Sequence, residues 1–282
     1  MTEQHPLHGL PADAVGIARG GEGAAVLHDG RVLGVWEGRR WEAELGGTGR
    51  FVRHGVVYGP NGHVLVESAG RFGFLDGRTG EVLAGFKRST PTHVVRRGVL
   101  DAERVVLEVG SGFEVYEPRT ERVVLRMQAD VAFMGAVNTC AIDPLGRTLE
   151  VAGSEGMDAG WFERFELSTG ASLGKRGAGY GIDAVDLDPD GGSVFLDDYR
   201  GLAGFPHTGS CQGRDLWLCG DALYVTFRER VLRLTDPSGP EVSWAASWPS
   251  DLCASDDGSW VAVITRGHAH ITPFPGSAWA PS

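Results

Sequence analysis

The fold is decided by Phe74-Leu75-Asp76-Gly77-Arg78-Thr79-Gly80, where a strand-like alternation of apolar and polar residues runs into a tight turn. Equivalent stretches follow at residues 115–121, 165–170, 205–209 and 232–239. The period is roughly forty residues, which is the length expected of one unit in a radially repeated β-structure. The repeat therefore fixes the architecture, while leaving the function to be argued from individual residues.

A second element recurs between these turns. Another turn precedes an alternating strand at residues 60–66, 143–149, 188–196 and 255–263. Together the two marks divide each unit into four short strands, which in the second unit are expected at residues 51–58, 63–69, 71–76 and 81–87. Short strands separated by turn signals predict an all-β fold, and no helical stripe of apolar residues competes with this prediction.

Seven such units predict a single seven-bladed β-propeller domain over residues 1–282, made of four-stranded antiparallel blades. The units after Ala178 are short and irregular, so a six-bladed ring is the alternative. The approximate blades are residues 14–46, 47–89, 90–129, 130–177, 178–213, 214–248 and 249–282.

The turns also support a family resemblance. Residues 76–83 are similar to the third-to-fourth strand turn of bacterial WD40/YVTN-like, quinoprotein-like repeat proteins, and Asp188-Pro189-Asp190-Gly191 is similar to their first-to-second strand turn. The Gly-His and Trp-Asp pairs of eukaryotic WD40 repeats are absent. The resemblance implies a seven-bladed propeller.

A propeller must close, because an open ring exposes two sheet edges. The last unit has three clear strands and needs a fourth. Residues 2–10 are the preferred candidate, because pairing the two chain ends also fixes both of them. Residues 277–280 are the alternative.

Composition limits the function classes. The net charge of −11 argues against a protein that coats nucleic acid or an anionic membrane. The basic pairs Arg39-Arg40 and Arg96-Arg97 are isolated and are expected on solvated strand edges. The first ten residues show no secretory signal, and four cysteines without a Cys-x-x-Cys motif indicate reduced thiols, so a cytoplasmic location is expected.

The fourth unit is longer than its neighbours. Thr120 and Thr169 are 49 residues apart, whereas Thr79 and Thr120 are 41 apart. The excess lies at residues 129–135 and 154–161, which in a propeller emerge on one face beside residues 175–181. Aromatic and Met residues on long loops of a rigid scaffold favour recognition, so a binding surface is predicted from seven residues. They are Phe133, Met134, Glu155, Met157, Asp158, Trp161 and Tyr180.

The alternative for this region is structural. Residues 131–137 then form an extended inner strand, and Trp161 packs between blades.

Metal sites are weakly indicated. The acids Asp186, Asp188, Asp190 and Asp197 approximate a calcium loop, but position 12 is Asp instead of Glu. An ordinary strand-to-strand turn is the favoured interpretation. His268 and His270 share one strand face without an identifiable third ligand. No metal or other cofactor is predicted.

These observations predict a non-catalytic scaffold, monomeric by itself, that binds a protein partner through one loop face. The alternative is a propeller enzyme of the lyase or lactonase type, with a metal-assisted site at the axial channel. No catalytic residue is nominated, because the acids and histidines of such a site are scattered along the chain.

Overall fold

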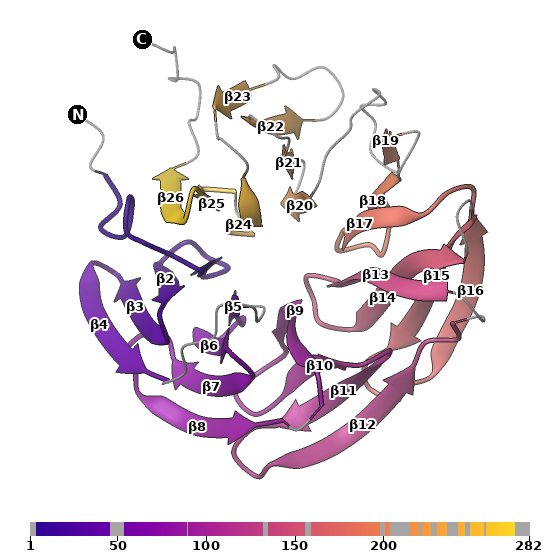
Figure 1. The fold of residues 1–282 in the computed structure, drawn as a ribbon, viewed down its shortest axis with the longest axis horizontal. Coiled ribbons are helices and arrows are strands. Elements are labelled where there is room, and N and C mark those ends of the chain that lie inside the picture. Colours follow the sequence, from indigo (N-terminus) through magenta and orange to yellow (C-terminus); the bar gives the residue numbers. More distant parts are fainter. Residues whose placement is uncertain are drawn as a thin grey trace.

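The computed structural model describes twelve ranges of the chain: residues 4–45, 54–88, 90–131, 135–155, 159–197, 201–203, 215–219, 222–226, 230–235, 242–245, 249–256 and 258–273. All elements in these ranges are β-strands, and they form seven antiparallel sheets around a common axis (Figure 1). Within the same ranges no helix is long and apolar enough to span a bilayer. The all-β propeller with four-stranded antiparallel blades is confirmed.

Each sheet is a meander in which consecutive strands pair. The first four sheets are β1 (Ala14–Ile17), β2 (Gly23–His28), β3 (Arg31–Trp36) and β4 (Arg39–Glu44); β5 (His54–Tyr58), β6 (His63–Ser68), β7 (Arg71–Asp76) and β8 (Val82–Lys87); β9 (Thr92–Val99), β10 (Val105–Val109), β11 (Gly112–Glu117) and β12 (Arg122–Gln128); and β13 (Gly135–Ile142), β14 (Thr148–Glu155), β15 (Ala159–Glu166) and β16 (Ser172–Ala178).

The remaining three sheets follow in the same order around the axis. They are β17 (Ile182–Leu187), β18 (Ser193–Asp197) and β19 (Gly201–Ala203); β20 (Asp215–Cys219), β21 (Ala222–Thr226), β22 (Arg230–Thr235) and β23 (Val242–Ala245); and β24 (Ser250–Ala254), β25 (Trp260–Thr265) and β26 (His268–Pro273).

The first strand of every sheet lies next to the axis (Figure 1). Each of these inner strands contacts the inner strand of the following sheet, and β24 contacts β1 again, so the ring is closed. The four strands expected in the second unit are found as β5 to β8, with boundaries differing by up to three residues.

The repeated turn that marks the sequence joins the third strand to the fourth. In the second sheet the amide of Gly80 donates to the carbonyl of Asp76 at 2.8 Å, and the Asp76 carboxylate accepts from the amide of Arg78. Gly80 has a φ of 77°, a conformation that glycine adopts without the steric penalty of a side chain. The Gly170 amide makes the same bond to Glu166 in the fourth sheet.

The hydrophobic core lies between the blades. Seven clusters of buried apolar side chains are found in the described residues, and each joins two adjacent sheets. The middle strands supply most of it, because both of their faces are covered, whereas the outer strand β16 is exposed over nearly its whole length. Stability is therefore distributed around the ring.

Residues 7–12 close the ring by lying along β26. The amide of Gly9 donates to the carbonyl of Ala269 at 2.7 Å, and the Ala269 amide donates back to Leu10 at 2.9 Å. Pro11 forms an antiparallel bridge with His268, and Leu7 is 3% exposed in the cluster between the first and last sheets. The predicted closure by the N-terminal segment is confirmed, and it extends two residues further than expected; residues 277–280 lie outside the described ranges.

Histidines line this seam. The rings of His8 and His270 meet edge to face at 5.2 Å between centroids, as do those of His5 and Trp260. Burial and then the neighbouring His8 lower the pKa of His5 to about 4. Burial, His8 and His268 also lower the pKa of His270. His268 and His270 therefore contribute to the closing seam.

Mild acid should weaken the seam. A lowered folded-state pKa means that the unfolded chain takes up the proton first, so the stability from neutral His5 is lost as the pH falls from about 6.5 towards about 4. Over this pH window the melting temperature of the His5→Asn variant should fall less than that of the native chain. Parallel pH profiles of melting temperature for the two proteins would contradict this prediction.

Candidate functional site

Lys175 joins the loops at the tip of the fourth blade. Its Nζ donates to the backbone carbonyl of Asp130 at 2.6 Å and to Oε1 of Glu155 at 2.9 Å. Asp130 precedes β13, Glu155 ends β14, and Lys175 lies on β16, so one ammonium links three segments of the blade. Hydrogen bonding to Glu155 raises the pKa of Lys175, which keeps the ammonium charged.

Tyr180 lies against the same tip. It follows β16, and its backbone carbonyl approaches Gly160 so closely that a Cβ on Gly160 would collide with the carbonyl oxygen. Glycine is therefore required at the start of β15. The described parts of the two long segments of the fourth unit and the following loop thus lie close together, as expected from the loop geometry of a propeller.

Trp161 is placed in the core. Its side chain is 2% exposed within the cluster between the third and fourth sheets, which agrees with the alternative that it packs between blades. It is paired across β15 with Gly153 on one side and Gly177 on the other, and a Cβ on Gly153 would come within 3.0 Å of the indole. The Lys175 ammonium lies 5.2 Å from the ring centroid, so Trp161 supports the tip from below.

Four of the predicted binding residues lie outside the described ranges: Phe133, Met134, Met157 and Asp158. Of the seven predicted residues, the structure thus places Glu155 and Tyr180 at the tip and Trp161 beneath it.

The four acids of the approximate calcium loop do not converge. Asp186 is fully buried and pairs with Arg97, while the carboxylate of Asp188 accepts from the amide of Gly192 within its own turn. Asp190 is exposed, and Asp197 pairs with Ile182 at the opposite end of the β17–β18 hairpin from that turn. The stretch is a strand-to-strand turn, the favoured interpretation.

One other group has the composition of a metal site. Ligand atoms of Asp13, His28 and Asp29 lie within 4.8 Å of one another. The Nδ1 atom of His28 faces Asp13 at 3.4 Å, and its Nε2 atom faces Asp29 at 3.6 Å. Each imidazole nitrogen therefore faces a different carboxylate, and both acids are exposed to solvent, a grouping that is common on protein surfaces without an ion.

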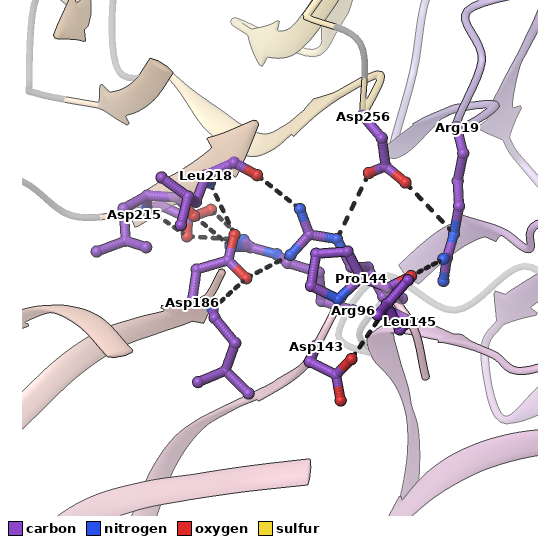
Figure 2. Close-up of polar contacts among 12 residues, drawn as sticks. Arg19, Arg96, Asp143, Pro144, Leu145, Asp186, Asp215, Leu218 and Asp256 are labelled. Carbon is purple, nitrogen blue, oxygen red and sulfur yellow. Dashed lines mark hydrogen bonds and ion pairs between the residues drawn. The ribbon is translucent and has the colours of Figure 1, made fainter. Parts of the chain in front are cut away.

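Buried ion pairs cross the axial channel (Figure 2). Arg97 extends from β9 and is 2% exposed. Its Nη1 donates to Oδ1 of Asp186 on β17 at 2.5 Å, and its Nη2 donates to the carbonyl of Leu218 on β20 at 2.7 Å. One guanidinium thus connects the third, fifth and sixth blades.

Two further arginines complete this network. Arg96 donates through Nη2 to both carboxylate oxygens of Asp215, at 2.7 and 2.8 Å, and through Nη1 to the carbonyl of Leu216. Arg19 lies 3.9 Å from the Asp256 carboxylate and donates to the carbonyl of Pro144 at 2.5 Å. Burial lowers the pKa of Arg19, an effect that Asp256 opposes.

The prediction that Arg96 and Arg97 lie on a solvated strand edge is wrong, whereas Arg39 and Arg40 are exposed on an outer strand as expected. The position of the pair within its unit could have indicated this location, because a pair of arginines in the first strand of a unit lies next to the axis. Their acidic partners are far away in sequence and were not identifiable. Because guanidinium groups already neutralise Asp186 and Asp215, the channel is cross-linked by charge pairs instead of presenting a cluster of metal ligands.

Comparison with known protein families gives no match to this chain, and comparison with curated proteins likewise finds no similar sequence. Solved structures do match. The Cps50 (Swd1) β-propeller domain of Myceliophteria thermophila superimposes with a TM-score of 0.70 at 10% identity, covering 98% of this chain and 100% of that domain.

Two further similar structures come from different assemblies. A chain of a mitotic checkpoint complex has a TM-score of 0.67 at 10% identity, with 96% of this chain and 90% of that chain covered. A chain of Kuenenia stuttgartiensis hydrazine synthase has a TM-score of 0.64 at 12% identity, with 97% of each chain covered. The similarity is one of fold, and the fold is that of β-propeller proteins.

Proposed function

We propose that this protein is a non-catalytic scaffold that binds a protein partner through the tip of its fourth blade. The fourth-blade tip is the surface around Asp130, Glu155, Lys175 and Tyr180. The observation that carries the proposal is the double contact of Lys175, because it holds Asp130, which precedes β13, and Glu155, which ends β14, against β16. A surface ordered before binding loses less entropy when a partner docks.

The blade beneath the tip is suited to this role. Three of its strands, β13, β14 and β15, contain eight residues each, so the tip is supported by long strands. Trp161 packs directly under Lys175. Recognition residues are commonly carried on loops held by a rigid scaffold. One of the similar chains belongs to a mitotic checkpoint complex, in which that propeller is part of an assembly.

We also propose that the protein belongs to the YVTN-like bacterial family and that it is located in the cytoplasm. The turn at residues 76–80 supports the family, and the reduced cysteines Cys140, Cys219 and Cys253 suit a reducing compartment. The proposal also includes Phe133, Met134, Met157 and Asp158 as further contacts of the partner, because their chain neighbours border the tip.

The test is capture of partners from the source cells with matched variants. Glu155→Lys combined with Tyr180→Ala should lower the affinity for a stoichiometric protein partner by at least about tenfold, because it reverses one charge and removes one aromatic contact. Val82→Ala, on the exposed outer strand β8, is the control and should retain the partner. Affinity is measured with the captured partner once purified.

Both variants should unfold at the native midpoint, since neither changes a fully buried side chain. Equal partner binding by the tip variant and the control would place the interface elsewhere on the ring. Trp161 is unsuitable for this test because removing it would disturb the core.

A further inference from the structure

The axial channel contains a cavity separate from the fourth-blade tip. Its volume is about 200 Å³, and it lies among the inner strands β1, β5, β9 and β24 with Trp217 of β20. Its walls are a mixture of apolar side chains, among them Val15, Val56 and Leu252, and charged ones. The charged side chains are Asp251 and members of the arginine–aspartate network (Figure 2).

Two strained residues face this channel from different blades. Arg97 and Asp251 have φ angles of 57° and 52°, in the left-handed region that residues other than glycine rarely occupy. Both lie inside inner strands at places where the pairing register shifts. A bulge re-aims a side chain, and such strain is frequent at functional sites.

The charges of the channel do not balance. Arg96 pairs with Asp215, Arg97 with Asp186, and Arg19 with Asp256. Asp251 is the carboxylate left over. Its Oδ2 accepts from the backbone amide of Val15 at 2.7 Å, and among the described residues no lysine or arginine lies within ion-pair distance of it.

The surroundings of Asp251 make this imbalance costly. Burial, with Asp215 adding to it, raises the pKa of Asp251 to about 7, although the Val15 amide and the charge of Arg96 act in the opposite direction. An ionised carboxylate without a counter-ion in apolar surroundings is destabilised, and a bound cation relieves that penalty.

We propose that the axial cavity binds a small protonated aliphatic amine. The ammonium group pairs with the Asp251 carboxylate, and a short carbon chain packs against Val15, Val56 and Leu252. An organic amine fits better than a metal ion, since the two carboxylates that line the cavity, Asp251 and Asp256, offer too few oxygen ligands for a metal, and Asp256 is already paired with Arg19. The ring nitrogens Nδ1 of His54 and Nε1 of Trp217, buried without a hydrogen-bond partner among the described residues, provide polar contacts for a substituent on the amine.

The probe is n-butylammonium chloride, titrated into the full chain by calorimetry and followed in parallel by thermal unfolding. At pH 8 we expect saturable one-to-one binding and a rise in melting temperature. 1-Butanol and butyrate, which have the same chain without a positive charge, should bind at least about tenfold more weakly. At pH 6, where Asp251 is mostly protonated, the affinity for butylammonium should fall about tenfold.

Asp251→Asn is the decisive variant, because the amide oxygen can still accept from Val15 while the charge is removed. It should lose butylammonium binding by at least about tenfold and should melt no lower than the native chain at pH 8. Glu42→Gln, which changes an exposed acid on β4, is the matched control and should bind normally.

Other titratable groups face Asp251, so the pH dependence needs its own control. They are Asp215 and Arg96, which are paired with each other, the Cys253 thiol, whose pKa burial raises, and His54 on β5. His54→Gln should leave the pH dependence intact. Equal binding by the native chain and Asp251→Asn, or no saturable binding of butylammonium at pH 8, would overturn the proposal without affecting the fourth-blade tip.

Discussion

Replacing Arg97 with methionine is expected to destabilise the folded protein by about 3–5 kcal/mol, because it leaves a buried carboxylate without its counter-ion. Asp186 is fully buried, and its remaining hydrogen bonds come from the amides of Leu187 and Leu218. The lost guanidinium also contacts the Leu218 carbonyl and lies 4.8 Å from the Trp217 ring centroid. Urea unfolding measures the change in the free energy of unfolding.

Two variants separate a lost charge pair from lost packing. Arg97→Met combined with Asp186→Asn should recover a large part of the stability, because the uncompensated charge is gone while the side-chain volumes are nearly kept. Arg122→Met removes an exposed pair with Glu117 and should leave the midpoint of urea unfolding almost unchanged, because solvent screens such a pair. If Arg97→Met destabilised the protein as little as Arg122→Met, the channel network would not be holding the blades together.

Deleting residues 2–10 is expected to destabilise the ring by about 3–5 kcal/mol. The deletion exposes the surface covered by Leu7, whose burial is worth about 1.5–3 kcal/mol. It also removes the hydrogen bonds of Gly9 and Leu10 to Ala269, each worth about 0.5–1.5 kcal/mol. The outer edge of β26 then lies open to pairing with another chain, so concentration-dependent association should accompany the loss of stability.

The matched control is deletion of residues 2–4, which keeps the segment that contacts β26. It should unfold at the native midpoint of the denaturant curve. An unchanged midpoint after deletion of residues 2–10 would show that the ring holds without its N-terminal segment.

The fold was predictable because its determinants are local. The turn at Asp76–Gly80 needs a carboxylate and a glycine at fixed positions along the chain, and the structure uses both of them there. Alternation of apolar and polar residues likewise set the strands of the second unit. Counting strands in the last unit predicted that one more segment closes the ring, with residues 2–10 preferred over residues 277–280.

The candidate sites were predictable only in part. The excess length of the fourth unit predicted that Glu155 and Tyr180 would lie on one face, and the structure places both of them at the same tip. Sequence alone left Trp161 with two alternatives, and its environment was decided by pairing with Gly153 and Gly177 on the neighbouring strands.

By itself, the sequence determined the repeat and the all-β propeller, because turns and strand alternation are encoded by residues adjacent in the chain. Only the tertiary structure decided which charges meet at the axis. Arg97 reaches Asp186 and Leu218 across 89 and 121 residues of chain. Asp251 is left without a cationic partner among the described residues, because closure of the ring matches three arginines with three other aspartates. Such contacts depend on where whole blades lie, which no local spacing in the sequence records.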